Sequence, residues 1–363
     1  GRENINTMAY KSLDPSLQKA LHKGLVIPAH PLALDQHRKL DEKRQRLLTR
    51  YYIASGADGV AVAVHSTQFE IRQPEIGLLE PVLKIAAEEI DKAAPDRPFI
   101  KVAGVIGRTE NALKEAELAA KYGYDIALLS NGGMPDLSEK ELIARASRVA
   151  EILPLFGFYL QPAVGGRLLS YDFWMDFADI PNVYAIKVAA FNRYQTLDVV
   201  RAVCNSERRD EIALYTGNDD NIVADLVTPY RIPVNGKIVE KRFVGGLLGH
   251  WAVWTSKVVE LLKEIKHRLQ TDPASIEDLL AKGIAITDMN AVIFDAQHAF
   301  HGCIPGIHEV LRRQGLMEGR WCLNPNEEVS PGQLEEIDRI YKENADLTDD
   351  EFVRQFLERQ KAQ

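Results

Sequence analysis

Apolar runs of strand length alternate along the chain with longer amphipathic runs that have helical periodicity. The strand-like runs are apolar throughout, which is typical of parallel strands that helices cover on both faces. We predict eight strands, at residues 24–29, 59–64, 99–105, 124–129, 155–160, 180–191, 211–215 and 243–248.

Each predicted strand is followed by a predicted helix. The helices are expected at residues 40–54, 75–93, 109–122, 138–152, 171–178 and 196–205, from about residue 218, and at 251–270. Ser138 to Glu141 form a capping-box pattern. Eight strand–helix pairs between residues 23 and 270 predict an α/β fold, the (β/α)8 or TIM barrel. No Gly-x-Gly-x-x-Gly motif follows the first strand, which disfavours a dinucleotide-binding sheet.

Three segments lie outside this repeat. Residues 1–22 form a polar lead-in, and whether residues 1–7, ahead of Met8, are native is left open. Asn235-Gly236 between two β-prone runs predicts a hairpin insertion near residues 230–243. Residues 271–363 predict a helical C-terminal extension, with helices near 275–282, 304–314, 331–344 and 349–359.

Lys187 is the single charge inside the apolar run 180–191. Because side chains alternate along a strand, Lys187 shares its face with the small residues Ala185 and Ala189, which leaves space for a ligand. A buried ammonium is costly unless it is paired or loses its proton. A neutral amine is what Schiff-base catalysis on a carbonyl substrate requires. The alternative interpretation is a lysine that reaches solvent or pairs with a buried carboxylate.

In a barrel of this class the active site lies at the carboxyl ends of the strands. The polar residues that follow the predicted strands are His30, residues 65–68, residues 130–133, Tyr159 to Gln161, Lys187, residues 216–220 and His250. Lys187 and Tyr159, on adjacent strands, are the useful pair, because the lysine can form an imine while the tyrosine moves protons.

Charge and composition narrow the partners and the location. The formal net charge of -8 provides no basic field for nucleic acid or an anionic membrane. No apolar stretch is long enough to span a bilayer and the N-terminus lacks a signal-peptide layout, so we expect a cytoplasmic protein. Cys204, Cys303 and Cys322 show no CxxC spacing, so we expect buried thiols rather than disulfides or a zinc site.

Several motifs occur in a specific order along the chain. They are Pro28-Ala29, a hydroxyl-rich turn after the second strand, Gly104-Val105, Tyr159-Leu160-Gln161-Pro162, Pro181-Asn182-Val183 with Ile186-Lys187, Thr216 to Asp219, and Ile304 to Leu311 with Gly315-Leu316. This order resembles the dihydrodipicolinate synthase and N-acetylneuraminate lyase superfamily of class I, pyruvate-type aldolases, from about residue 24 to about residue 345. The lysine and the Tyr-x-x-Pro motif are specific in combination, whereas either alone is weak.

The resemblance implies roles for individual residues. Lys187 would be the Schiff-base lysine and Tyr159 the phenol that shuttles protons. The family's Gly-Thr-Thr-Gly-Glu turn, which binds the oxo-acid carboxylate, corresponds to residues 64–68, where either Ser66 or Thr67 would be the carboxylate-binding hydroxyl. Helix capping is the alternative role of both hydroxyls. The further candidates for substrate contact are Gln68, His30, Asn131, Gln161, Gly217 and Asn218. For two of them a purely structural role is the alternative: His30 as a loop histidine and Asn218 as a helix cap.

The chain also departs from the family pattern. Residues 131–135 replace the segment that carries the tyrosine donated across the family's dimer, and Val164 replaces the arginine that follows Tyr-x-x-Pro in the synthase. Both losses argue against dihydrodipicolinate synthesis itself. The resemblance still implies a homo-oligomer, either a dimer or a tetramer.

The leading hypothesis is a Schiff-base-forming lyase, an aldolase or a hydro-lyase, that acts without a cofactor on a 2-oxo acid such as pyruvate or a keto-deoxy sugar acid. A non-catalytic ligand-binding barrel, a sensor or regulator, is the alternative. A metal-dependent class II aldolase is a third reading, which predicts loss of activity with a chelator. The sequence contains no tight His-x-His or His-Glu-x-x-His spacing of the kind that would indicate a metal site.

His65 stands where the family has a relay threonine, and we hypothesise that its imidazole replaces part of the proton relay to Tyr159. A His65→Ala enzyme is therefore expected to turn over about 10²-fold more slowly, the lower end of what general acid–base catalysis contributes. Steady-state kinetics on the oxo-acid substrate measure this, and unimpaired turnover would contradict the relay.

Overall fold

The computed structural model describes residues 11–363. Residues 1–7, whose origin the sequence leaves open, lie outside the described residues. One eight-stranded sheet has the order β1-β10-β7-β6-β5-β4-β3-β2, and a parallel bridge joins Ala29, next to β1, to Ala61 of β2. Because this bridge links the two ends of the strand order, the sheet closes on itself. The fold is the (β/α)8 barrel with C-terminal helices that the sequence predicts.

Two compact units make up the described chain. The first contains the described part of Gly1–Leu25 with Ile100–Asn218 and Asp225–Gly246, and the second contains Val26–Phe99, Asp219–Ala224 and Leu247–Gln363. The expected boundary between residues 270 and 271 falls inside the second unit.

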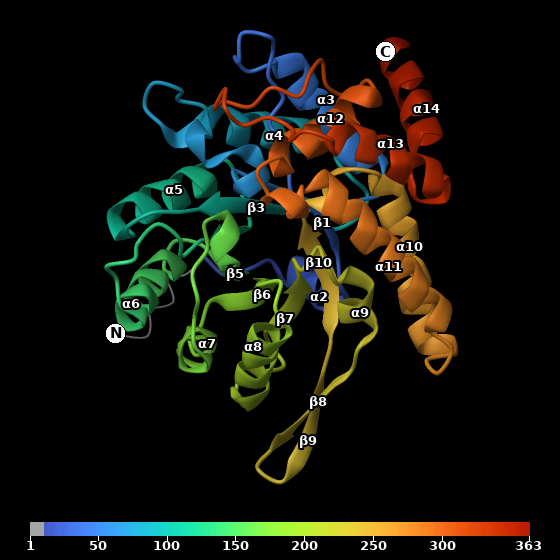
Figure 1. Ribbon diagram of the computed structural model, residues 1–363. Helices are drawn as coiled ribbons and strands as arrows, with labels where there is room; N and C mark the ends of the chain where they lie inside the picture. The colour runs from blue at the N-terminus through green and yellow to red at the C-terminus, as the bar shows by residue number, and fades with distance from the viewer. Residues whose placement is uncertain (1–10) are drawn as a thin grey trace. The chain divides into compact units, whose positions relative to one another are not determined.

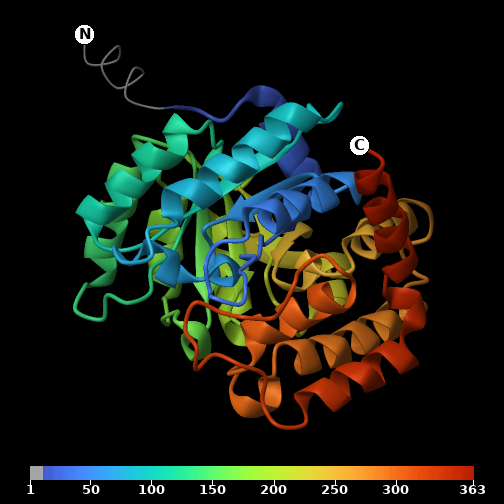
Figure 2. The ribbon, with the colours of Figure 1, turned by 90° about the horizontal axis from the view of Figure 1, so that it is seen from above.

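The first unit holds the middle strands of the barrel, and its teal and green helices lie outside its green strands (Figure 2). Its elements are α2 (Pro15–Lys23), β3 (Ile100–Val105), α5 (Thr109–Lys121), β4 (Ile126–Leu129), α6 (Glu139–Ala150), β5 (Leu155–Leu160), α7 (Tyr171–Ala178), β6 (Val183–Ala189), α8 (Arg193–Asn205), β7 (Ala213–Thr216), β8 (Tyr230–Val234) and β9 (Lys237–Lys241). All four residues of β4 and of β7 are buried, as expected for parallel strands covered by helices.

Local sequence signals explain how several of these elements begin and turn. The capping box predicted at the start of α6 is present: Ser138 Oγ accepts from the Glu141 N–H at 3.1 Å, and Glu141 Oε1 accepts from the Ser138 N–H at 3.0 Å. The strands β8 and β9 pair antiparallel around Asn235 and Gly236, whose φ angles are 49° and 80°. Both values suit a tight two-residue turn. The hairpin extends well beyond β7 and contacts α8 through part of its length (Figure 1).

The second unit contains the first two strands and all the C-terminal helices. Its elements are β1 (Val26–Pro28), α3 (Glu42–Ala54), β2 (Gly59–Val62), η1 (His65–Thr67), η2 (Phe69–Arg72), α4 (Leu79–Ala93), α10 (Thr255–Thr271), α11 (Glu277–Ile293), α12 (Cys303–Arg313), α13 (Gln333–Glu343) and α14 (Asp350–Lys361). Two elements are shared between the units, α9 (Ile222–Val227) and β10 (Phe243–Leu248).

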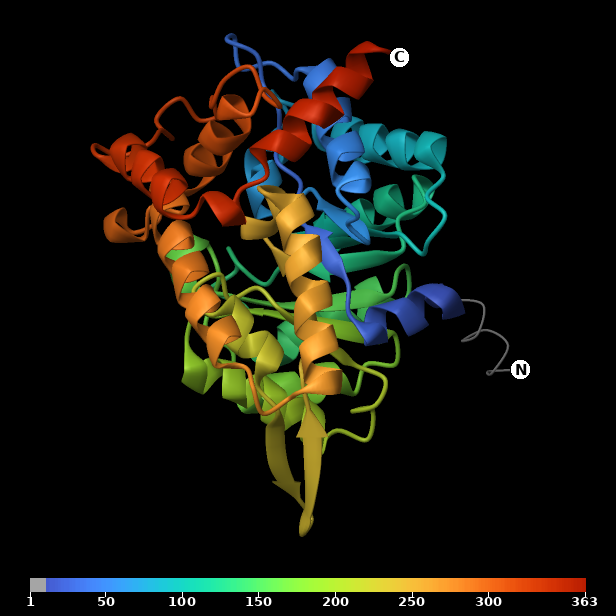
Figure 3. The same cartoon turned by 90° about the vertical axis from the view of Figure 1, so that its right-hand side faces the viewer.

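The prediction for α11 was wrong in length, because the helix continues well past residue 282. Gly283 is a point of close packing inside this helix. A Cβ atom on Gly283 would lie 2.9 Å from Val223 Cβ. The helix α11 lies beside α10 (Figure 3), to which Arg268 and Asp278 join it at 2.8 Å.

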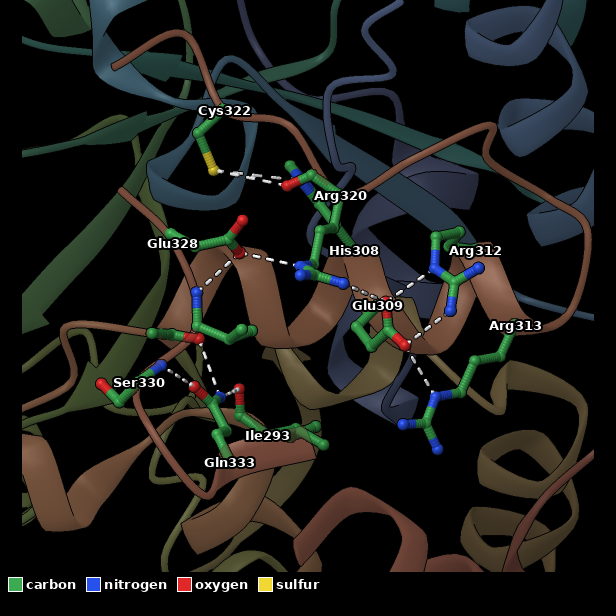
Figure 4. A network of polar contacts seen from close by, with 12 residues as sticks. Ile293, His308, Glu309, Arg312, Arg313, Arg320, Cys322, Glu328, Ser330 and Gln333 are labelled. Atoms are coloured by element: carbon green, nitrogen blue, oxygen red, sulfur yellow. Dashed lines mark hydrogen bonds and ion pairs between the residues drawn. The ribbon is translucent and has the colours of Figure 1, made fainter. Parts of the chain in front are cut away.

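A buried carboxylate organises the C-terminal helices. Glu309 of α12 accepts hydrogen bonds from Arg312 at 2.7 Å, Arg313 at 2.8 Å and Arg320 at 3.2 Å (Figure 4). Burial raises the pKa of Glu309, but the hydrogen bonds of Arg312 and Arg313 outweigh it and lower the pKa to about 2. Arg320 belongs to the segment between α12 and α13, so this cluster fixes that segment against α12.

Candidate active site

Lys187 lies in β6 of the first unit with 8% of its surface exposed. Its Nζ atom is 4.5 Å from the centre of the Phe158 ring, and Phe158 is its register partner in β5. A cation within about 6 Å of a ring face is attracted to the ring. The aromatic ring is therefore an immediate neighbour of the candidate nucleophile.

Gly217, directly after β7, makes room for the lysine. A Cβ atom at this position would lie 2.5 Å from Lys187 Cε and 2.9 Å from Ala189 Cβ. The Gly217 N–H donates to Val188 O at 2.7 Å, which fixes the backbone where it is. Any larger residue would have to displace the lysine side chain.

The structure does not bring Tyr159 next to Lys187, which differs from the pairing that the sequence predicts. Tyr159 pairs in register with Val188, and alternation places its side chain on the face of the sheet opposite Lys187. Its hydroxyl donates to Leu169 O and accepts from the Leu169 N–H, both at 3.1 Å. Its ring lies 5.6 Å from that of Trp174 in α7. Burial raises the pKa of Tyr159, which keeps the phenol protonated.

Asn131, after β4, is oriented by a buried arginine. The Arg145 guanidinium donates to Gly107 O at 2.7 Å, to Ser130 O at 2.6 Å and to Asn131 Oδ1 at 3.3 Å. Burial lowers the pKa of Arg145 to about 10, so it stays charged at neutral pH. Because the carbonyl of the Asn131 amide faces the guanidinium, the NH2 group is directed elsewhere as a donor.

Two glycines bring the loops after β4 and β5 into backbone contact. A Cβ atom on Gly132 would lie 1.9 Å from Gly165 O, so this place admits no side chain. Arg167 adds hydrogen bonds across the same loops, to Met134 O at 3.1 Å and Leu137 O at 3.0 Å. The segment after β4 thus packs closely on the loop after β5.

Asn218 lies in a closed hydrogen-bonded network. Its Oδ1 accepts from the Phe191 N–H at 3.0 Å, and its Nδ2 donates to Asp225 Oδ2 at 2.9 Å. Asp225 also accepts from Thr216 Oγ1 and Arg193 Nη1, both at 2.7 Å. These bonds join the ends of β6 and β7 and explain why α9 begins at Ile222 rather than near Asn218.

Gln161, also predicted to contact substrate, lies half-buried at the start of the loop after β5.

His30 lies in the core of the second unit with both ring nitrogens engaged. Nδ1 donates to Pro31 O at 2.7 Å, and Nε2 accepts from Thr49 Oγ1 at 2.8 Å. Burial lowers the pKa of His30 to about 4, so the ring is neutral. A substrate contact would have to break one of these bonds.

The turn after β2 holds the predicted carboxylate-binding hydroxyls. Thr67 Oγ1 donates to His30 O at 2.7 Å, whereas Ser66 Oγ is 3.4 Å from the same oxygen. The turn is bracketed by Ala63 and Gln68, whose φ angles of 65° and 73° are unusual for residues other than glycine. Backbone strain of this kind clusters at functional sites. His65 starts the turn, with its ring 5.8 Å from that of Phe69.

Gln68 connects this turn to the C-terminal segment. Its Oε1 accepts from the Leu323 N–H at 2.8 Å, while its buried Nε2 has no partner within the described residues. Glu70 follows Gln68 by two residues, and Glu327 follows Leu323 by four. The negative charges of these two carboxylates repel one another. Burial first, and then the Glu70 charge, raise the pKa of Glu327 to about 7.

Sequence reasoning missed Phe158, Arg145 and Asp225. Arg145 left a signal, since it follows Leu142 by three residues and so lies on the apolar stripe of its helix. Phe158 and Asp225 left no such signal, because cross-strand register and loop closure are not visible in the sequence.

None of the helices within residues 11–363 is long and apolar enough to span a bilayer.

A (β/α)8 barrel with a buried lysine on its sixth strand is the class of protein that these observations define. The sequence matches the dihydrodipicolinate synthetase family over residues 23–229. That span is more than half of the 363 residues, and the chain belongs to this family.

Individual relatives differ in their activities. The chain is 28% identical over 205 residues to N-acetylneuraminate lyase of Citrobacter koseri, covering 56% of this chain and 65% of that protein. It is 25% identical over 191 residues to 4-hydroxy-tetrahydrodipicolinate synthase of Clostridium novyi, covering 51% and 59%. The chain therefore matches less than two thirds of the length of either relative.

Solved structures agree on the fold. Dihydrodipicolinate synthase from Oceanobacillus iheyensis superposes with a TM-score of 0.69 at 17% identity, over 90% of this chain and 98% of that one. N-acetylneuraminate lyase from Fusobacterium nucleatum gives 0.68 at 16% identity, over 89% and 99%. At these identities the similarity shows the architecture alone.

The raised pKa of Glu327 predicts a pH-dependent stability. Between about pH 4.5 and pH 7 the Glu327 carboxyl holds a proton in the folded protein and releases it in the unfolded chain. The contribution of Glu327 to the free energy of unfolding therefore falls as the pH rises through that window. Urea unfolding at pH 5 and pH 8 should show a smaller loss of stability for Glu327→Gln than for the wild type. Glu335→Gln, at an exposed site in α13, is the control. Equal losses in wild type and Glu327→Gln would contradict the prediction.

Proposed function

We propose that the protein is a Schiff-base-forming lyase that acts on a 2-oxo acid such as pyruvate or a keto-deoxy sugar acid. The observation that carries the proposal is the buried Lys187, with the space beside it that Gly217 provides. Membership of the dihydrodipicolinate synthetase family supports it.

In the proposed reaction the Lys187 nitrogen attacks the carbonyl carbon of the oxo acid. The hydroxyl of the neutral carbinolamine takes up a proton and leaves as water, and a protonated imine remains. In carbon–carbon cleavage, the imine takes up the electron pair of the breaking bond and becomes a neutral enamine, while the departing carbon's hydroxyl loses its proton and becomes a carbonyl. In carbon–oxygen elimination, the carbon next to the imine first loses a proton to give the enamine, whose electron pair then expels the hydroxyl, which leaves as water after taking up a proton. Protonation and hydrolysis of the enamine release the oxo acid and restore the amine.

Other residues would bind the substrate. The Ser66–Thr67 turn would hold the carboxylate, and Ser66 is the better donor because the Thr67 hydroxyl is already committed to His30 O. The NH2 group of Asn131, directed by Arg145, would meet an acceptor oxygen of the substrate. His30 and Asn218 would act by holding the structure around them, in view of their hydrogen bonds.

The loss of the family's exchanged tyrosine and of the arginine after Tyr-x-x-Pro argues against dihydrodipicolinate synthesis. The second candidate is a ligand-binding barrel without turnover, which the placement of Tyr159 away from Lys187 favours. Trapping of an imine together with release of a cleaved product distinguishes the enzyme from such a sensor.

Incubation with pyruvate followed by borohydride is expected to reduce an imine at Lys187, because hydride addition makes the carbon–nitrogen bond permanent. Mass spectrometry of the digested protein should find the adduct on the peptide that contains Lys187, and Lys187→Ala should lose it. Lys257→Ala, in α10, should keep it as the matched control. Absence of an adduct with every 2-oxo acid in a panel would remove the proposal.

Ser66→Ala and Thr67→Val should have different effects. Ser66→Ala is expected to raise KM for the oxo acid about tenfold, the value of one modest hydrogen bond, with little change in stability. Thr67→Val is expected to lower the free energy of unfolding by about 1–3 kcal/mol, because His30 O loses its closest donor. Steady-state kinetics and urea unfolding measure the two effects, and the reverse pattern would reassign the carboxylate-binding hydroxyl to Thr67.

A further inference from the structure

The residue that faces Lys187 on the neighbouring strand is aromatic and has no ionisable group. Phe158 pairs with Lys187 in register, so the two side chains share one face of the sheet. The Nζ atom lies 4.5 Å from the ring centre. Both residues are more than nine-tenths buried. A cation–π contact is strongest in such surroundings, where water competes least.

We propose that the ring of Phe158 stabilises positive charge on the Lys187 nitrogen, in the ammonium and in the protonated imine. The role in the protonated imine rests on the proposed function. Phe158 is then a catalytic residue that contacts the reacting nitrogen.

The charge changes of the reaction explain what the ring would do. The carbinolamine is neutral, and it becomes an iminium cation when the nitrogen lone pair forms the second carbon–nitrogen bond and the hydroxyl leaves as water with a proton taken from solvent. The negative face of an aromatic ring favours the cation over the neutral carbinolamine. The contact therefore increases the fraction of substrate held as the imine.

Fluorinated phenylalanines at position 158 test the ring directly, since each fluorine weakens the negative face while the ring keeps nearly the same size. Two readouts are taken: acetylation of Lys187 by acetic anhydride as a function of pH, and the yield of borohydride-trapped pyruvate adduct. The acetylation midpoint should move to lower pH with each added fluorine. The adduct yield at low pyruvate should fall stepwise, and Phe158→Leu should lower it about 5- to 30-fold.

Fluorinated phenylalanines at position 156 are the matched control, because Phe156 lies two residues earlier on the same face of β5 and its ring packs against Tyr215. They should leave the acetylation midpoint and the adduct yield unchanged. An unchanged acetylation midpoint across the fluorine series would overturn the role of Phe158. An equal shift of the midpoint with fluorine at position 156 would overturn it as well, because the effect would not be specific to the ring beside Lys187. A fluorine-dependent midpoint in a protein that never forms an adduct would support the charge contact and remove the proposed lyase function.

Discussion

Removal of the Lys187 amine from water is the constraint around which the first unit is arranged. A lysine inside a parallel sheet needs space for a long side chain and something to offset its lost hydration. Gly217 provides the space, since even a methyl group there would collide with the lysine. The Phe158 ring lies where it can interact favourably with the nitrogen.

The loops after β4 and β5 pack directly on one another in the first unit. Gly132 allows this close approach, because a Cβ atom at that position would collide with Gly165 O. Tyr159 and Arg167 hold the same loop through backbone atoms. Close packing and hydrogen bonds to backbone atoms therefore fix these two loops together.

In the second unit, the turn after β2 depends on segments far from it in sequence. Thr67 holds the backbone of His30, and Gln68 holds that of Leu323. The C-terminal segment that carries Leu323 is itself fixed to α12 by Glu309 and its arginines. The C-terminal helices therefore contribute to the conformation of the turn as well as to the core.

The sequence alone determined the barrel, because continuous apolar strands alternating with amphipathic helices have few other solutions, and local signals such as the Ser138 capping box act within a few residues. It also singled out Lys187 as the candidate nucleophile, since a single charge in an apolar strand is conspicuous. Only the tertiary structure decided which neighbours that lysine has. The face that Tyr159 takes depends on the register between β5 and β6, and a shift of one residue exchanges the two faces. The partners of Asn218, His30 and Gln68 depend likewise on chain segments brought together by folding, which no local pattern encodes.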